Sequence, residues 1–384
     1  MGWGRRFARA LSLMVALLAL PRPALAAPPI TVGDGTAASC TQAALRDALT
    51  AAGSRGGGTV RFRCGRNRVT ITLTATLTPS DNTTIDGGGL ITLDGALAVR
   101  VVFVGRDTSV VLNNLGISNG TSAGSPELSG GGAYNAGALT VMNSTFSGNG
   151  GVPLGNGGAI HNEGTLAVAN STFSGNGRGV EVGGAISNGG TLTVESSTFS
   201  GNDTDIGGGG IFNQGALTVG DSTFSGNGAE VGGGIMNVGT LTITNSLLSD
   251  NVSEVGGGIF NQGALTVDNS EFSGNHAFAA GAIYNGATLT VSNSAISGNT
   301  AGILDGGAIF NVGSLTVYKS TIAENTAGAS GGGIFNGGRL TVKSSAITNN
   351  IAREDGGGIY TCCGGTLTLR NTSVTGNTPD NIAP

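Results

Sequence analysis

Side chains that could act as an acid, a base or a nucleophile are sparse in this sequence, because only 11% of its 384 residues are charged. The two histidines, His161 and His276, fall in separate, non-adjacent repeats of the chain, which argues against a histidine triad or zinc site. Hydrolysis of a glycosidic bond needs two carboxylates across a bound sugar. Glu195 and Glu271 occupy different positions of the repeat. No catalytic residue can therefore be named from the sequence.

Acidic residues gather in the variable stretches that separate each "GN" from the next "GG". They are Glu181, Asp203, Asp205, Glu230, Glu254, Asp305, Glu354 and Asp355. Glu230 and Glu254 lie one repeat apart and are expected to be stacked neighbours. Clustered carboxylates can bind calcium, whereas like charges on solvated loops are the more common explanation. Ca²⁺ is thus the one cofactor candidate, with Glu230 and Glu254 as its candidate ligands.

A column of mostly large side chains directly follows the repeated isoleucine position. Its members are Tyr134, His161, Ser187, Phe212, Met236, Phe260, Tyr284, Phe310, Phe335 and Tyr360. Consecutive residues of a strand face opposite sides, so if isoleucine faces the core, the column lies outside. The part from Phe212 to Tyr360 is then an apolar stripe that predicts contact with sugar rings or a partner protein. The alternative is that loops cover the stripe or that a bulge turns it inward.

The elements that must position these residues come from an internal repeat. "GGGIFNQGALTV" occurs identically at Gly208 to Val219 and at Gly256 to Val267. A leucine marks each of ten units with a period of 24 to 27 residues: Leu139, Leu166, Leu192, Leu217, Leu241, Leu265, Leu289, Leu315, Leu340 and Leu367. Such a period indicates a solenoid, and the glycine content excludes helical repeats. The prediction is an all-β parallel β-helix of about ten coils with three short strands each.

Asparagines recur at two turn positions of each unit. One column is Asn135, Asn162, Asn188, Asn213, Asn237, Asn261, Asn285, Asn311 and Asn336, and the other runs from Asn149 to Asn377. Stacked amides can hydrogen-bond along the axis of the solenoid. We expect both columns to be scaffolding, because such ladders satisfy turn amides that would otherwise be unpaired.

Two motifs carry a resemblance to known families. "GGAI" at Gly157 to Ile160 and "FSGN" at Phe146 to Asn149 resemble the repeats of polymorphic outer membrane proteins, over about Gly130 to Asn377. "CTQAALRDAL" and "TTIDGGGLITLDG" in the preceding segment are similar to the amino-terminal part of pectin-lyase-like β-helix proteins. The resemblance implies a right-handed coil and a surface or extracellular location. The surface-displayed relatives end in a membrane-inserted barrel, and no comparable segments follow Asn377, so self-anchoring is not expected.

The predicted organisation is a signal peptide at 1–26, a cap with the first coils at 27–129, and the repeat helix at 130–384. Cys40 and Cys64 are the favoured disulfide pair, while free thiols or an intermolecular bond stay open for Cys362 and Cys363. No further stretch is apolar enough to span a bilayer. The net charge is −5, and with no basic cluster expected outside the leader, nucleic acid is not an expected partner.

Three functions are compatible with these features. The first is a secreted or surface-exposed interaction protein, adhesin-like or carbohydrate-binding, whose partner is a carbohydrate or a cell-surface protein. Its candidate binding residues are Phe212, Met236, Phe260, Tyr284, Phe310, Phe335 and Tyr360. The alternative is a polysaccharide lyase or glycoside hydrolase, which the resemblance suggests. A remote third is ice binding, because "TLT" recurs at Thr191, Thr240, Thr288 and Thr366. The oligomeric state is not predicted.

Overall fold

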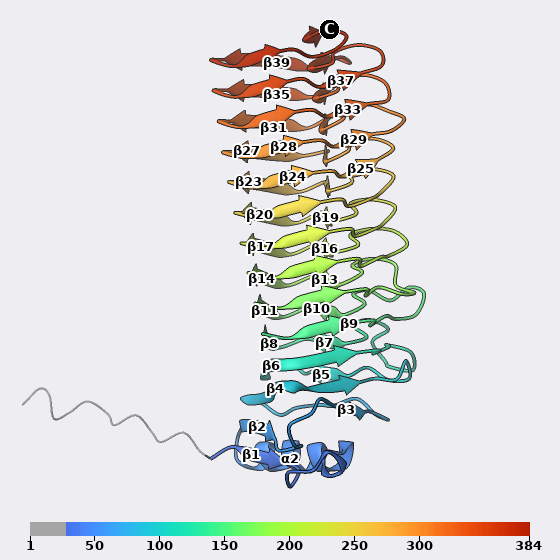
Figure 1. The fold of residues 1–384 in the computed structure, drawn as a ribbon, viewed down its shortest axis with the longest axis vertical. Coiled ribbons are helices and arrows are strands. Elements are labelled where there is room, and N and C mark those ends of the chain that lie inside the picture. Colours follow the sequence, from blue (N-terminus) through green and yellow to red (C-terminus); the bar gives the residue numbers. More distant parts are fainter. Residues whose placement is uncertain (1–27) are drawn as a thin grey trace, which may run out of the picture.

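The computed structural model describes residues 28–384, so the predicted signal peptide lies outside the described residues. The chain forms a right-handed parallel β-helix whose coils stack into one long column above an amino-terminal cap (Figure 1). The predicted fold class is confirmed. The coils also extend below the ten repeats, because strands of the segment before Gly130 pair with the repeat strands.

The cap contains one helix and the first strands. They are β1 (Ile30–Val32), the 3₁₀ helix η1 (Ala37–Ser39), α2 (Gln42–Ser54), β2 (Gly58–Phe62) and β3 (Val69–Thr72). The Thr41 hydroxyl begins α2 by accepting a hydrogen bond from the Ala44 N–H at 3.2 Å. Leu45, Ala48, Leu49 and Ala52 form the buried face of this helix. A disulfide joins Cys40 to Cys64, the pair that the sequence favoured.

Each full coil contributes a first, a second and a third strand. The first strands form a 12-stranded sheet: β5 (Val102–Val104), β7 (Ala133–Asn135), β10 (Ile160–Asn162), β13 (Ile186–Asn188), β16 (Ile211–Asn213), β19 (Ile235–Asn237), β22 (Ile259–Asn261), β26 (Ile283–Asn285), β30 (Ile309–Asn311), β34 (Ile334–Asn336), β38 (Ile359–Thr361) and β41 (Ile382–Ala383). The second strands follow β4 (Thr83–Asp94) and β6 (Ser109–Ser118): β8 (Ala138–Met142), β11 (Thr165–Ala169), β14 (Thr191–Glu195), β17 (Ala216–Gly220), β20 (Thr240–Thr244), β23 (Ala264–Asp268), β27 (Thr288–Ser292), β31 (Ser314–Tyr318), β35 (Arg339–Lys343) and β39 (Thr366–Arg370).

The third strands are β9 (Thr145–Ser147), β12 (Thr172–Ser174), β15 (Thr198–Ser200), β18 (Thr223–Ser225), β21 (Leu247–Ser249), β24 (Glu271–Ser273), β28 (Ala295–Ser297), β32 (Thr321–Ala323), β36 (Ala346–Thr348) and β40 (Ser373–Thr375). On the loop side, a 4-stranded sheet consists of β25 (His276–Ala277), β29 (Thr300–Ala301), β33 (Thr326–Ala327) and β37 (Ile351–Ala352).

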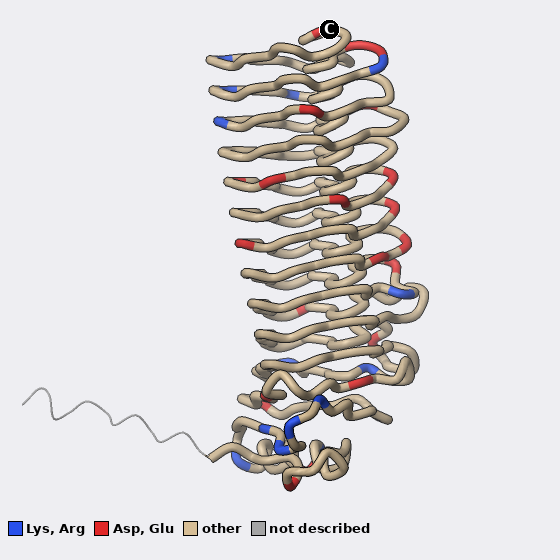
Figure 2. The backbone as a smooth tube through the Cα atoms, viewed as in Figure 1, with Lys and Arg blue, Asp and Glu red and all other residues tan. Residues whose placement is uncertain are grey.

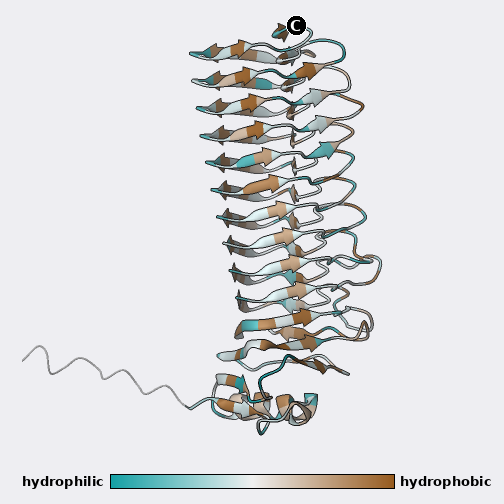
Figure 3. Ribbon diagram, in the orientation of Figure 1, coloured by the Kyte–Doolittle hydropathy of each residue, from teal (hydrophilic) through white to brown (hydrophobic). Residues whose placement is uncertain are grey.

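Equivalent residues of successive coils lie directly above one another. Leu217 pairs with Leu192 on one side and with Leu241 on the other, and the same register holds along the repeats. The inward side chains therefore form continuous apolar columns, as the brown bands on the strands show (Figure 3). In one column, Phe173, Phe199 and Phe224 stack with ring centroids 4.8 and 4.6 Å apart. A coil that stacks well on a copy of itself can be repeated unchanged, which accounts for the identical twelve-residue segments.

Both asparagine columns form buried ladders, as predicted. In the first, each Nδ2 donates to the Oδ1 of the next coil, for example Asn213 to Asn237 at 2.8 Å. In the second, Asn251 Nδ2 donates to Asn275 Oδ1 at 2.9 Å and to the Phe224 carbonyl at 3.0 Å. These bonds pair backbone groups that the turns would otherwise leave unsatisfied.

A third ladder, of serines, was not predicted. The Ser222 N–H donates to Ser246 Oγ at 3.1 Å, and the Ser222 hydroxyl donates to the Gly220 carbonyl. Each ladder serine follows a residue with positive φ, such as Asp221 at 47°, at the point where the chain bends between the second and third strands. The sequence located this bend but gave no role to the serine, because serine is common in any turn.

Close backbone approach explains the glycine pairs that precede most of the repeated isoleucines, with Ala280 and Gly281 as the one exception among them. A Cβ on Gly233 would lie 2.5 Å from the Val252 carbonyl oxygen and 2.8 Å from that of Gly257. Gly232 has a φ of 63°, which is strained for other residues. No larger side chain fits between successive coils here.

Charge is distributed unevenly along the column. Carboxylates lie mainly on the loop side of the coils, whereas arginines gather at the base (Figure 2). Residues 46–68 contain six arginines, Arg46, Arg55, Arg61, Arg63, Arg66 and Arg68, and all six are exposed. The expectation that no basic cluster lies outside the leader is therefore wrong for the cap.

Two further observations concern the last two cysteines and the helices. Cys362 and Cys363 form a disulfide with each other in the turn after β38, so neither is a free thiol in the structure. Among residues 28–384, no helix is both long and apolar enough to cross a membrane.

Replacing Asn251 by alanine should lower the free energy of unfolding by about 3 kcal/mol, because it leaves the buried Phe224 carbonyl and the Asn227 N–H without their partners. Urea denaturation followed by circular dichroism measures the change. Gln262→Ala, an exposed turn residue in the next coil, is the control and should change little. Equal denaturation midpoints for the two variants would show that the ladder contributes no stability.

Candidate functional site

The predicted apolar stripe lies on the outer face of the 12-stranded sheet. From β10 to β34, the isoleucine and asparagine of each first strand are 0% exposed, and the residue between them points outward. Phe212 and Phe335 are 8% exposed, whereas Met236, Phe260, Tyr284, Phe310 and Tyr360 are partly exposed. The column is thus on the surface, but much of each side chain is covered.

The rings cover one another. Ring centroids are 4.7 Å apart for Phe260 and Tyr284, 5.5 Å for Tyr284 and Phe310, and 4.4 Å for Phe310 and Phe335. These three pairs are stacked, so both faces of Tyr284 and Phe310 meet a neighbouring ring. Face-on stacking of a sugar is excluded at those two positions. A partner would meet ring edges and the tyrosine hydroxyls instead.

The stripe is widened by exposed valines of the adjoining turn. Val238 and Val312 are 43% and 44% exposed. Val312 Cγ1 and Phe335 Cε1 both lie within 4 Å of the position that a Cβ on Gly337 would take. Both side chains border the space that Gly337 leaves open. Gln262 and Gly286 occupy the turn positions between Val238 and Val312, so the valines extend the stripe only locally.

At its amino-terminal end the same column becomes a charged cluster. The Arg100 side chain is 2% exposed, and its guanidinium carbon lies 5.1 Å from the Tyr134 ring centroid. Tyr134 and His161 rings are 5.3 Å apart, and His161 Nε2 lies 3.7 Å from Glu163 Oε1. Arg100 also pairs with Glu127 at 3.0 Å and donates to the carbonyls of Ser129 and Gly130.

This cluster was missed from the sequence. The sequence analysis placed His161 in the outward column without a role, and Arg100, Glu127 and Glu163 lie at positions that do not repeat. The available signal was the pair His161 and Glu163, which flank a buried ladder asparagine and so must both point outward. Nothing in the sequence indicated that Arg100 would reach them.

Burial dominates the electrostatics of the cluster. It lowers the pKa of Arg100, although the bond to Glu127 opposes the shift. It raises the pKa of Tyr134, assisted by a hydrogen bond with Glu163. It lowers the pKa of His161, against the opposing effect of Glu163, and His161 Nδ1 is buried with no hydrogen-bond partner. Arg100 binds the segment 127–130 through these contacts, and the His161 ring packs beside it.

The acidic residues form a separate hollow on the loop side. The Glu254 N–H donates to the Glu230 carbonyl at 2.8 Å, so these residues are stacked neighbours as expected. The hollow has a volume of about 570 Å³ and is lined by Asp203, Thr204, Asp205, Gly228, Ala229, Glu230, Val252, Ser253, Glu254, His276 and Phe278. Burial, followed by the charge of Asp205, raises the pKa of Asp203. The Phe278 ring is 46% exposed.

The residues present do not fit a calcium site. Ca²⁺ takes six to eight oxygen ligands. Within residues 28–384, no group of three or more His, Cys, Asp or Glu is arranged to hold a metal ion. Glu230 and Glu254 alone supply too few ligands, and we do not retain calcium as a cofactor.

Comparison with known proteins agrees with the fold. A family model described as the right-handed beta helix region matches residues 232–382. The match covers less than half of the chain and agrees with the right-handed parallel β-helix that the structure forms. A search of curated proteins finds no match.

Several solved structures are similar to the chain at low sequence identity. PfbA, a surface adhesin of Streptococcus pneumoniae, is 13% identical with a TM-score of 0.48, covering 92% of this chain and 93% of its own. The A-module of the Azotobacter vinelandii mannuronan C-5 epimerase AlgE4 is 15% identical with a TM-score of 0.41, covering 90% and 96%. A mutant tailspike protein of E. coli bacteriophage HK620, in complex with a pentasaccharide, is 13% identical with a TM-score of 0.44, covering 86% and 61%. Identities this low do not identify a ligand for this chain.

Replacing His161 by serine, the residue that Ser187 supplies one coil later, should flatten the pH dependence of stability. Because the folded pKa of His161 is lowered, the unfolded chain binds the proton more readily, and wild-type stability falls as the pH drops below about 6.5. Urea midpoints near neutral pH and at about pH 5 measure this difference. Exposed His276→Ser is the control and should keep the wild-type slope. A wild-type slope in His161→Ser would refute the assignment.

Proposed function

We propose that the protein is an extracellular or surface-exposed interaction protein, adhesin-like or carbohydrate-binding, that binds its partner along the outer stripe. The observation that supports this is the outward column of apolar side chains from Met236 to Tyr360, of which all but Phe335 are partly exposed, together with the exposed Val238 and Val312 in the adjoining turn. Contiguous apolar surface of this kind marks contact sites in soluble proteins. The leader-like sequence at 1–26 and the resemblance to polymorphic outer membrane protein repeats support the location.

The stacked rings determine how a partner is met. Aromatic edges carry partial positive charge, so the strip offers an apolar surface that also tolerates the oxygen atoms of a glycan or a peptide backbone. Tyr284 and Tyr360 add hydroxyl groups that can donate or accept hydrogen bonds. Each coil presents nearly the same contact at the next position along the axis. An extended partner can therefore make many weak, similar contacts.

The acidic hollow offers a second contact suited to carbohydrate. Phe278 has an exposed ring, and within residues 28–384 it stacks on no other aromatic side chain. Asp205, Glu230 and Glu254 can accept hydrogen bonds from sugar hydroxyls beside it. The combination of a free ring and carboxylate acceptors is absent from the stripe.

Replacing Phe260, Tyr284 and Phe310 together by alanine should weaken binding to a glycan array or to whole cells by at least about tenfold, because the centre of the strip is removed. The triple variant Thr266→Ala, Thr290→Ala and Thr316→Ala is the matched control, since it changes the outward positions of the second strands in the same three coils.

The alanine variant also loses packing, so a leucine triple at the same positions separates binding from folding. Leucine keeps apolar volume and removes the rings. If the alanine triple and the leucine triple of the stripe both bind as the wild type does, the stripe is excluded as the contact surface. Thermal unfolding of each variant establishes that the coils remain folded.

One observation favours the enzyme alternative, a glycoside hydrolase or polysaccharide lyase. Asp203 lies in a hollow beside Asp205 and Glu230, and burial raises its pKa, as the general acid of such a reaction requires. If the hollow is catalytic, purified protein releases reducing ends or unsaturated products from a pectin and glycan panel. Asp203→Asn then loses that activity, while Asp305→Asn, which lies outside the hollow, keeps it. No product from any polysaccharide would eliminate this alternative.

A further inference from the structure

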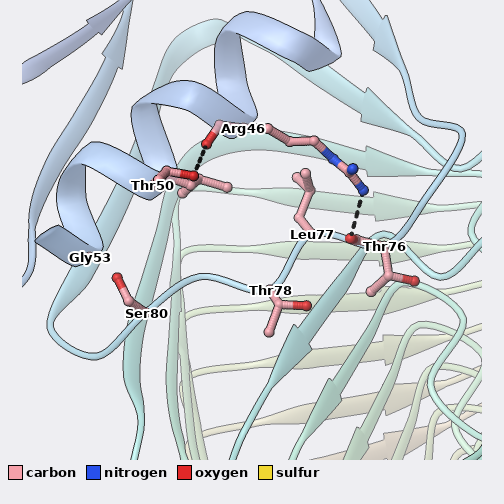
Figure 4. Close-up of a pocket in the computed structure, with 8 residues that line it drawn as sticks. Arg46, Thr50, Gly53, Thr76, Leu77, Thr78 and Ser80 are labelled. Atoms are coloured by element: carbon pink, nitrogen blue, oxygen red, sulfur yellow. Dashed lines mark hydrogen bonds between the residues drawn. The ribbon is translucent and has the colours of Figure 1, made fainter.

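A cleft in the cap lies far from the stripe and from the acidic hollow. It is formed between α2 and the segment 76–80, and has a volume of about 390 Å³ (Figure 4). Its lining residues are Arg46, Leu49, Thr50, Gly53, Thr76, Leu77, Thr78 and Ser80. Leu49 and Leu77 are 7% and 1% exposed and give the cleft an apolar floor. The remaining side chains supply four hydroxyls and one guanidinium.

The guanidinium is held at one end of the cleft with most of its donors free. Arg46 Nη2 lies 3.4 Å from the Thr76 carbonyl oxygen, a long hydrogen bond. Within residues 28–384, no carboxylate forms an ion pair with Arg46. The Thr50 hydroxyl donates to the Arg46 carbonyl at 2.9 Å, which leaves its oxygen able to accept. Figure 4 shows Arg46 and Thr50 on the helix side, facing Thr76, Thr78 and Ser80.

Charge favours an anionic ligand at this end of the molecule. Residues 28–80 contain six arginines and two aspartates, whereas residues 81–384 contain eight basic and 21 acidic residues. An anion is therefore attracted to the cap and repelled by the coils. Arginine binds a carboxylate through two parallel N–H bonds, a geometry that lysine cannot offer.

We propose that this cleft binds an acidic sugar residue, a hexuronate. The carboxylate pairs with Arg46, the sugar hydroxyls bond to Thr50, Thr76, Thr78 and Ser80, and one face of the ring lies over Leu49 and Leu77. A neutral sugar lacks the charged group that Arg46 requires. The site is independent of the stripe, so either can fail without the other.

Gly53 provides a position at which one methyl group would narrow the cleft. A Cβ at this position would lie 3.0 Å from Ser80 Oγ and 3.3 Å from Ser80 Cβ, and so would narrow the cleft. Gly53 lies inside α2, where glycine is less favourable than alanine. Gly53→Ala should therefore reduce binding while the melting temperature stays the same or rises.

The test is isothermal titration calorimetry of the mature chain with galacturonate and glucuronate, and with galactose and glucose as their neutral counterparts. The wild type should bind the uronates and not the neutral sugars. Arg46→Gln should weaken uronate binding by about tenfold or more, because it removes a charge-assisted pair. Gly53→Ala should also weaken it. Arg55→Gln, which removes an exposed arginine just beyond α2 and outside the cleft, should bind as the wild type does.

Three results would overturn the proposal. They are absence of uronate binding by the wild type, wild-type affinity in both Arg46→Gln and Gly53→Ala, and an equal loss in Arg55→Gln, which would indicate general attraction to a basic surface. The alanine triple variant of the stripe should retain full uronate binding. That result separates failure of this site from failure of the proposed function.

Discussion

The structure depends on one constraint, the in-register pairing of each coil with the next. Once register is fixed, every buried polar group of a turn must find its partner directly above or below it, because the apolar core and the next coil exclude water. The two asparagine ladders and the serine ladder meet this requirement, and their bonds recur at nearly constant length. The glycine pairs meet the matching steric requirement, since the coils approach too closely for a side chain.

The same constraint explains why much of the fold could be predicted. A residue such as Leu217 lies between the equivalent leucines of the coils on either side. The sequence of one repeat therefore defines the inward positions, the turns and the two asparagine columns of every repeat. What the sequence could not show is how side chains with the same direction contact one another. The outward direction of Phe260, Tyr284 and Phe310 followed from strand alternation, but their mutual stacking followed only from the spacing between coils. That stacking changes the kind of contact the stripe can make.

Residues outside the repeat were the least predictable. Arg100 reaches Tyr134 across coils of different sequence, and no periodic pattern marks it. The cap cleft requires a helix and an irregular segment to be placed side by side, and neither repeats. The exposed arginines of residues 61–68 were visible in the sequence, but their gathering at one end of the column became evident only with the fold. The repeat pattern therefore predicts the architecture well, but it does not predict the contacts of residues that lie outside the pattern.

The identical segments Gly208 to Val219 and Gly256 to Val267 present the same upper and lower surfaces to their neighbours. Loss of the stretch between them would leave the identical segment on partners that its two copies already have, and only the third strand and the loop after it would meet new neighbours. The number of coils in such a chain can therefore change by recombination with few new contacts between coils.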